Sequence, residues 1–366
     1  KAIKERYNEI IKGLGLKLSL EEQFETIKKQ FAAKAGKDYA ASRGEYLNGI
    51  IMANYLGYEF IDAATVICFD KNGESEKTNQ VMSERLANTE NAVIPGFYGA
   101  MPNGQVKTFS RGGSDVTGSI VARALKADVY ENWTDVSGFL VADPRIVENP
   151  KPIAIITYKE LRELSYMGAS VLHESAIFPV RKEGIPINIR NTNAPEDKGT
   201  MIVETTCSIP ECIITGIAGK KGFVAINIDK DMMNSEIGFG RKVLQVFEDN
   251  GISFEHMPSG IDTMTVIVHQ DEFVEKEQKV LAELHRAVNP DSIELESNLA
   301  LIAVVGRGMK NSVGNAANVI SALSNAKINV KMIDQGSSEL NIIVGVRNRY
   351  FEAAIRAIYD VFIPQK

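Results

Sequence analysis

The chain has 366 residues, of which 44% are hydrophobic and 24% charged, a balance that is ordinary for a globular protein of two or three domains. The formal net charge of −6 leaves no basic stripe, so nucleic acid is not an expected partner. No apolar run reaches the roughly 18 residues of a membrane helix, and no signal peptide is evident. These features predict a cytoplasmic protein without membrane contact.

The cysteines and histidines do not form a recognisable site. Cys68, Cys207 and Cys212 have neither the number of a disulfide framework nor the spacing of a zinc site, so we expect them to be reduced and structural. The four histidines are scattered along the chain, and no protein-borne metal site is predicted.

Helices are predicted to dominate residues 1 to about 60. Ser19 followed by Glu22 has the spacing of a capping box, and apolar residues recur at helical spacing after it. From there to about residue 191 the pattern alternates. Strands are expected within 58–67, 91–100, 127–136 and 185–191, and helices within 79–87, 116–125 and 158–182. This alternation predicts an α/β fold with a mostly parallel sheet covered by helices, and ligands at the carboxyl ends of its strands.

The pattern changes after about residue 205. A strand at 223–229, a helix at 239–249, a strand after the Asn250-Gly251 turn and a strand at 259–268 are followed by a closing helix within 268–288. From residue 301 the same order repeats, which indicates two tandem βαββ units. The predicted domains are residues 1–205, 206–298 and 299–366.

The stretch TFSRGGSDVTGSIVARAL (108–125) places a cation, two glycines, a hydroxyl and a carboxylate just before a predicted helix. Gly112 and Gly113 permit close backbone approach to a ligand, and Arg111 is a forked donor suited to a carboxylate or phosphate. Ser114 and Asp115 could cap the helix, and Asp115 could instead hold an ammonium group or a metal. The alternative is a tight strand-to-helix turn with an ordinary cap.

Two further stretches carry similar groups. WTDVSGFLVADPRI (133–146) contains Thr134, Asp135, Asp143 and Arg145, and SRGEYLNGI (42–50) places Glu45 in the first turn of a predicted helix. Taken singly, Glu45 could serve the helix dipole and Asp143 could start a turn. Their occurrence together in one α/β frame favours a binding site.

These three stretches, in this order, resemble the aspartate kinases of the amino-acid kinase superfamily. The stretch ELSYMGASVLHESAIFPVRKEGIPINIRNT (163–192) continues the resemblance, and VGRGMKNSVGNAANVISALSNAKINVKMIDQGSSELNI (305–342) resembles the family's second regulatory unit. The resemblance covers essentially the whole chain. It implies that the tandem βαββ units are ACT domains, which bind amino-acid effectors.

The resemblance implies transfer of the γ-phosphate of ATP to the side-chain carboxylate of L-aspartate, with Mg²⁺ held by the phosphates and water. Arg111 would clamp the α-carboxylate, Glu45 and Asp115 would face the ammonium, and the backbone of Gly112, Gly113 and Ser114 would lie close to the substrate. The residues implied at the nucleotide are Thr134, Asp135, Leu140, Asp143, Arg145 and Ser170.

Three departures from the family pattern affect the expected activity. The family opens with a strand and a lysine-phenylalanine-glycine-glycine-serine loop, which this chain does not show. Ser170 stands where many members have lysine, and Leu140 where a tyrosine is common. We therefore expect the chain as printed to lack the family's N-terminal segment and to have little or no kinase activity.

The resemblance also implies an effector site in the first βαββ unit. Its candidate residues are Met232, Ser235, Gly238, Phe239, Ser259, Gly260 and Asp262, although the methionine also fits core packing. Lysine is the expected effector, with threonine also considered, and a homodimer or tetramer is the expected assembly.

Two other functions are compatible with parts of the pattern. One is an amino-acid-sensing regulatory protein whose kinase-like domain is inactive. The other is a kinase for glutamate or acetylglutamate. The paired ACT units and the residues at 111–115 disfavour this function. P-loop enzymes and protein kinases are excluded because their phosphate-binding motifs do not occur.

Overall fold

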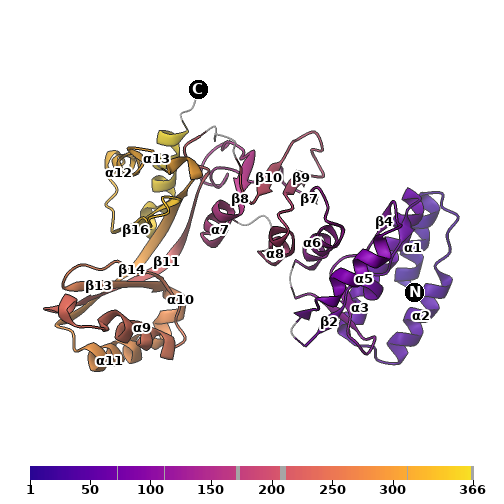
Figure 1. The fold of residues 1–366 in the computed structure, drawn as a ribbon, viewed down its shortest axis with the longest axis horizontal. Coiled ribbons are helices and arrows are strands. Elements are labelled where there is room, and N and C mark those ends of the chain that lie inside the picture. The colour runs from indigo at the N-terminus through magenta and orange to yellow at the C-terminus, as the bar shows by residue number, and fades with distance from the viewer. Residues whose placement is uncertain (72, 111, 170–173, 207–211, 311, 364–366) are drawn as a thin grey trace. The chain divides into compact units, whose positions relative to one another are not determined.

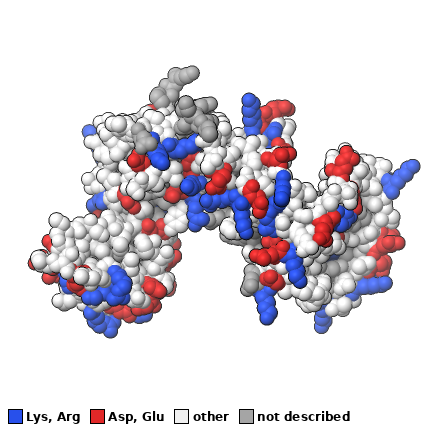
Figure 2. Space-filling model, viewed as in Figure 1, with Lys and Arg blue, Asp and Glu red and all other residues white. Residues whose placement is uncertain are grey.

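The computed structural model describes residues 1–71, 73–110, 112–169, 174–206, 212–310 and 312–363. The chain forms two compact units, drawn in Figure 1. The N-terminal unit comprises Lys1–Ser137 and Val171–Glu204, and the C-terminal unit comprises Gly138–Ser170 and Thr205–Lys366. Segment 138–170 therefore groups with the C-terminal part of the chain. Acidic and basic side chains are interspersed on the face that Figure 2 shows.

The N-terminal unit opens with three helices, α1 (Ala2–Gly13), α2 (Glu21–Ala32) and α3 (Lys37–Leu56). They pack through a small apolar cluster that contains Ile11, Leu20, Leu47 and Ile51. The predicted capping box at Ser19 is wrong, because Leu20 is the N-cap and its side chain makes no capping hydrogen bond; the Ser19 Oγ accepts only the Glu21 amide, at 3.5 Å. Leu20 is 1% exposed, so burial of this side chain in the cluster fixes where the helix begins.

The remainder of the N-terminal unit alternates short strands with helices. Its elements are β1 (Glu59–Phe60), α4 (Ala63–Val66), β2 (Phe69–Asp70), β3 (Gly73–Glu74), α5 (Lys77–Leu86), β4 (Ala92–Val93), β5 (Tyr98–Ala100), β6 (Val106–Thr108), α6 (Gly113–Leu125), β7 (Tyr130–Thr134), α8 (Glu174–Lys182), β9 (Ile187–Asn191) and β10 (Thr200–Val203). Strands β1 and β4 are parallel, as are β7 and β9, whereas β9 and β10 are antiparallel. The prediction of an α/β fold with a mostly parallel sheet is confirmed.

Several predicted elements are shorter than expected or divided, and the strand predicted over 91–100 is split into β4 and β5. The strand predicted over 58–67 ends at Phe60, because Asp62 accepts a hydrogen bond from the Ala64 amide at 3.0 Å and starts α4. The helix predicted over 158–182 is interrupted, since its first part ends at Tyr166 and Gly168 has a φ of +103°.

The C-terminal unit contains segment 138–170 followed by a repeated structure. Its elements are β8 (Ile155–Thr157), α7 (Tyr158–Tyr166), β11 (Gly216–Asp229), η1 (Met233–Ser235), α9 (Phe239–Asp249), β12 (Phe254–His256), β13 (Thr263–His269), α10 (Gln270–Phe273), η2 (Val274–Lys276), α11 (Glu277–Val288), β14 (Ser292–Val305), η3 (Arg307–Met309), α12 (Asn315–Asn325), β15 (Met332–Asp334), β16 (Asn341–Arg347), η4 (Asn348–Tyr350) and α13 (Phe351–Phe362). We call residues 216–288 the first repeat and residues 292–362 the second repeat. The predicted tandem βαββ units are confirmed.

The two repeats share one six-stranded sheet in the order β12-β13-β11-β14-β16-β15. The long strands β11 and β14 pair antiparallel at its centre, from Gly216 opposite Val305 to Asp229 opposite Ser292. Strand β14 therefore begins nine residues before the predicted start at 301, and residues 292–296 also pair with β11.

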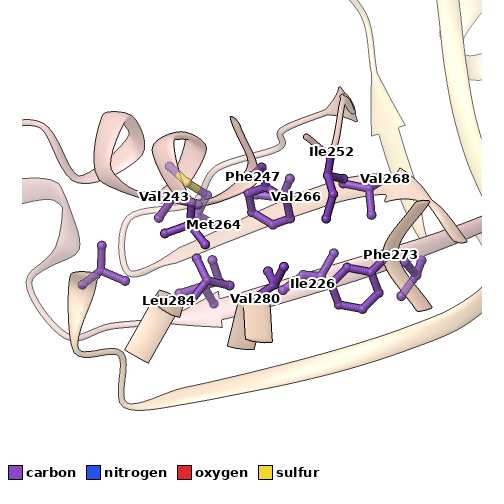
Figure 3. Packing of buried hydrophobic residues seen from close by; sticks show 14 of the residues in the cluster. Ile226, Val243, Phe247, Ile252, Met264, Val266, Val268, Phe273, Val280 and Leu284 are labelled. Atoms are coloured by element: carbon purple, nitrogen blue, oxygen red, sulfur yellow. The ribbon is translucent and has the colours of Figure 1, made fainter. Parts of the chain in front are cut away.

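The core of the first repeat lies between its helices and its strands (Figure 3). Helix α9 buries Phe239, Val243, Val246 and Phe247, which recur at the spacing of one helical face. The helix predicted over 239–249 is confirmed with the same bounds.

Candidate substrate and effector sites

Helix α6 begins inside the glycine motif rather than after it. Gly112 has a φ of +55° and takes the N-cap position, and no described side chain caps this helix. Ser114 and Asp115 therefore lie within its first turn, and the expectation that they cap the helix is wrong. The first-turn amides of a helix have no intrahelical partner and carry partial positive charge, so this end of α6 favours an anion. Arg111 lies outside the described residues.

Two glycines bring the start of α6 against the loop that follows β4. A Cβ on Gly113 would stand 2.5 Å from the Phe97 Cβ, and a Cβ on Gly96 would stand 2.8 Å from the Ser114 Oγ. The Phe97 amide also donates to the Thr117 Oγ1 at 3.0 Å. Only residues without a side chain fit at these two points, so the glycines set the position of the α6 N-terminus.

A cavity of about 440 Å³ in the N-terminal unit adjoins this helix end. Its lining residues are Glu45, Leu86, Thr89, Glu90, Ala92, Ile94, Gly96, Ser114, Thr117, Gly118, Val121 and Leu125. The volume suits a small ligand, and the walls combine apolar side chains with two carboxylates and three hydroxyls. The structure thus brings the predicted residues Glu45 and Ser114 together on one cavity.

Glu45 reaches the cavity from an unexpected part of its helix. Helix α3 begins at Lys37, so Glu45 lies in the helix interior and not in the first turn, which corrects the prediction. The helix starts early because Gly36, with a φ of +93°, stands at its N-cap. From α1, the Tyr7 hydroxyl donates to the Gly44 carbonyl at 3.0 Å. Burial first, and the negative charge of Glu45 second, raise the pKa of Tyr7.

Asp115 is oriented by strand β7. Its Oδ1 accepts a hydrogen bond from the Asn132 Nδ2 at 2.9 Å, and its backbone carbonyl accepts one from the Tyr130 hydroxyl at 3.1 Å. Burial raises the pKa of Tyr130 to about 12, so the phenol keeps its proton at neutral pH and remains a donor. Asn132 was not predicted, and its only sequence signal is the polar side chain within a strand.

The predicted nucleotide residues fall in both units. Thr134 ends β7, and its hydroxyl lies 3.3 Å from the Asp135 Oδ1 in the N-terminal unit. Leu140, Asp143 and Arg145 belong to the C-terminal unit, and Ser170 lies outside the described residues.

Arg145 projects into solvent and is paired with its neighbour. Its side chain is 88% exposed, and the Nη2 donates to the Asp143 Oδ2 at 2.6 Å. Asp143 also accepts the Arg145 amide at 2.8 Å, so it forms the turn that the alternative interpretation proposed. The side-chain hydrogen bond from Arg145 holds the pKa of Asp143 below its usual value.

The two predicted effector loops of the first repeat lie side by side. The Lys230 amide donates to the Asp262 carbonyl at 2.8 Å, which joins the loop before α9 to the loop between β12 and β13. Met232 is 68% exposed, and Ser235, Ser259, Gly260 and Asp262 are also exposed. Gly238 has a φ of +84° and is the N-cap of α9.

Phe239 does not belong with these exposed residues. It is 3% exposed and packs in the core of the first repeat, because it is the first inward position of α9. The prediction that its side chain contacts an effector is wrong. Sequence reasoning missed Glu236 in the same loop, which lies 2.9 Å from Lys230 and 2.6 Å from Lys242. Hydrogen bonds from Lys242 and Lys230 lower the pKa of Glu236.

Within the described part of the chain, no three His, Cys, Asp or Glu side chains are grouped as metal ligands would be. Across the same residues, no helix has the length and apolar character needed to span a membrane.

Comparison with known proteins agrees with the fold. The model of the amino acid kinase family matches residues 3–191, and the ACT domain model matches residues 302–362. Aspartokinase 3 of Bacillus subtilis is 42% identical over 336 residues, which cover 89% of this chain and 74% of that protein. The solved structure of Clostridium acetobutylicum aspartate kinase has 54% identity and a TM-score of 0.88, covering 99% of this chain and 83% of that chain.

Two structures of Escherichia coli aspartokinase III share the fold at lower identity. The complex with lysine and aspartate has 23% identity and a TM-score of 0.69, and covers 99% of this chain and 84% of that chain. The complex with aspartate and ADP has 22% identity and a TM-score of 0.68, and covers 98% of this chain and 86% of that chain. The family matches and the 42% identity over most of the chain confirm the resemblance seen in the motifs. The chain therefore belongs to the aspartate kinases, phosphotransferases of the amino acid kinase family that carry C-terminal ACT domains.

Proposed function

We propose that this chain binds L-aspartate and ATP for phosphorylation of the aspartate side chain to 4-phospho-L-aspartate, at the head of lysine, threonine and methionine synthesis in the cytoplasm. The observation that carries the proposal is the cavity where Glu45 from α3 meets Ser114 at the open N-terminus of α6. A zwitterion needs an anion near its ammonium and a cation or free amides near its carboxylate. Glu45 and Asp115 supply the first, and Arg111 with the α6 amides supplies the second.

The reaction does not require the protein to remove a proton from its substrate. The side-chain carboxylate of aspartate has a pKa of about 4, so it is already a nucleophile at neutral pH. Catalysis then depends on in-line positioning and on neutralising the charge of the transferred phosphoryl group. ATP would arrive as its Mg²⁺ complex, with the metal held by phosphate oxygens and water. Within the C-terminal unit, Arg145 is a guanidinium in solvent that can exchange Asp143 for a phosphate.

We propose that lysine regulates this activity through the first repeat, with threonine as the second candidate. The joined loops present the carboxylates of Glu236 and Asp262 and the uncapped start of α9, which suit the ammonium and carboxylate groups of an amino acid. Three apolar side chains beside them, Met232, Ile237 and Ile261, are 68%, 98% and 69% exposed. Such exposed apolar residues favour burial against a second copy of the chain, so we propose a homodimer.

Calorimetric titration of the chain tests both the proposed aspartate site and the proposed lysine site, and it does not require turnover. We expect L-aspartate to bind, and succinate, which lacks the ammonium, to bind at least tenfold more weakly, because a hydrogen bond to a charged group is worth about 1.5–3 kcal/mol. L-lysine should bind and L-methionine should not. Equal affinity for succinate and aspartate would contradict the proposal that Glu45 and Asp115 bind the ammonium group. If lysine binds but neither aspartate nor ATP does, the result would favour the alternative function, an amino-acid-sensing protein with an inactive kinase-like domain.

A further inference from the structure

Helix α7 carries a carboxylate that is fully buried and fully hydrogen-bonded. Glu160 is 0% exposed. Its Oε2 accepts the Thr157 amide at 2.8 Å and the Thr157 hydroxyl at 2.7 Å, which completes a capping box. Its Oε1 accepts the Thr215 hydroxyl at 2.5 Å and the Arg307 amide at 2.8 Å. The Arg307 Nη1 lies 3.1 Å from Oε2 and completes an ion pair.

A helix cap does not explain this arrangement. The capping box needs only Thr157 and one oxygen of Glu160. The second oxygen of Glu160 accepts hydrogen bonds from Thr215 and Arg307, and Arg307 also supplies the cation; these residues lie 55 and 147 positions away along the chain. Apolar residues of the same volume often stabilise a protein as well as a buried ion pair does. Such a pair is better explained by a need to hold two segments in one register.

At the opposite end of the β11–β14 pair, the position that corresponds to Glu160 is filled by Asp291, the residue just before β14. Asp231 and Arg307 are each the second residue after the long strand of their repeat. The Asp231 amide donates to the carboxylate of Asp291 at 2.6 Å, whereas the Arg307 amide donates to Glu160. Asp291 precedes β14 as Thr215 precedes β11. Thr215 has no carboxylate, and its hydroxyl donates to the carboxylate of Glu160 from α7.

Other contacts fasten the rest of segment 138–170 to the repeats. The Asn341 Nδ2 donates to Glu163 at 2.7 Å, the Ile217 amide donates to the Val141 carbonyl at 2.6 Å, and the Lys151 amide donates to the Tyr359 hydroxyl at 2.9 Å. The same segment carries the proposed nucleotide residues Leu140, Asp143 and Arg145. Segment 138–170 is therefore bonded to the repeats at several points within one compact unit, so a change in the repeats can reach these residues through it.

We propose that Glu160 is the positioning residue that couples the two repeats to the nucleotide residues of segment 138–170, so that effector occupancy changes nucleotide affinity through the bonds from Glu160 to Thr215, which directly precedes the first repeat, and to Arg307 in the second. The proposal rests on the proposed function, because it requires both an effector and a nucleotide. Coupling of this kind is reciprocal, so it can be measured as the ratio of lysine Kd values with and without ADP.

The experiment titrates lysine into the chain alone and into the chain saturated with Mg-ADP. In the unmodified chain we expect the two Kd values to differ by a factor of about 5 to 150. Glu160→Gln should keep each ligand's separate Kd within about threefold and bring the ratio close to 1. Glu352→Gln is the matched control, because Glu352 pairs with Lys221 on the surface of the same unit, and it should keep the full ratio.

A second pair of variants covers the case in which Glu160→Gln does not fold. Thr215→Val replaces the hydroxyl with a methyl group and should also bring the ratio of Kd values close to 1. Thr215→Ser keeps the hydroxyl and should keep the full ratio. A purely structural role would lower the melting temperature and leave the ratio intact, which would overturn the proposal. A ratio of 1 in the unmodified chain, with both ligands bound, would also overturn it while leaving the proposed function standing. Failure of lysine or ADP to bind would instead count against the proposed function.

Discussion

Replacing Arg307 with methionine should lower the free energy of unfolding by about 3–5 kcal/mol at pH 7, because the Glu160 carboxylate would stay buried without its cation. Glu160 is 0% exposed, and the Arg307 side chain is 18% exposed. Water therefore cannot replace the lost partner readily. Urea denaturation followed by circular dichroism measures the change.

The loss should depend on pH in a defined direction. Burial alone would raise the pKa of Glu160, but hydrogen bonds from Thr215, Arg307 and Thr157 outweigh it and lower the pKa from its ordinary value near 4.5. The stability from this carboxylate is therefore present above about pH 4.5 and is lost as the pH falls through the lowered pKa. In the Arg307→Met variant, protonation of Glu160 removes the unpaired buried charge. The difference in free energy of unfolding between the unmodified chain and this variant should therefore become smaller in acid.

A surface arginine of the same unit provides the control for this measurement. Arg286 lies 3.9 Å from Glu283 and is 74% exposed. Arg286→Met should change the stability by less than about 1 kcal/mol at any of these pH values. Equal losses in the two variants, or a gap for Arg307→Met that widens in acid, would contradict the account of Glu160.

Replacing Gly113 with alanine should abolish detectable binding of aspartate and destabilise the N-terminal unit by about 1–3 kcal/mol or more. The new Cβ would stand 2.5 Å from the Phe97 Cβ and 2.9 Å from the Phe97 Cα. A clash with backbone cannot be relieved by rotating a side chain, so the start of α6 must move away from the loop at Gly96 and Phe97. That movement displaces Ser114 and the free amides from the cavity wall.

Gly13→Ala is the matched control, since Gly13 ends α1 and a Cβ there would meet no described atom within 4 Å. It should leave aspartate binding unchanged. Calorimetric titration of both variants with L-aspartate gives the comparison. Tight binding by Gly113→Ala would show that the α6 N-terminus does not form part of the substrate site.

The parts of the fold that sequence predicts best are those in which local pattern and tertiary environment agree. Helix α9 is such a case, because its buried residues Phe239, Val243 and Phe247 already stand at helical spacing. The start of α2 is the opposite case. Ser19 and Glu22 have the spacing of a cap, yet the buried side chain of Leu20 decides where the helix begins. Local capping contributes about 1 kcal/mol, and burial of a leucine contributes more.

Only the residues of the candidate site that lie in recognisable motifs could be predicted from the sequence. Residues 111–115 and Glu45 could be singled out because charged and glycine residues cluster there and resemble a known family. Asn132, Glu90 and Gly96 could not, since nothing in their own neighbourhoods distinguishes them from ordinary strand and loop residues. The bond between Glu160 and Arg307 joins residues 147 positions apart, and such pairs follow from the three-dimensional fold rather than from any local pattern.

The central claim is that residues 111–115 bind a small zwitterion, and Arg111→Ala tests it most directly. Titration with L-aspartate and with Mg-ATP should show a large loss of affinity for aspartate alone, because one bidentate carboxylate contact is worth about 2–5 kcal/mol, or roughly 30- to 5,000-fold in Kd. Arg6→Ala, which removes an exposed cation paired with Glu9, should leave both affinities unchanged. Equal losses for aspartate and ATP, or no loss for aspartate, would contradict the assignment of Arg111 to the substrate carboxylate.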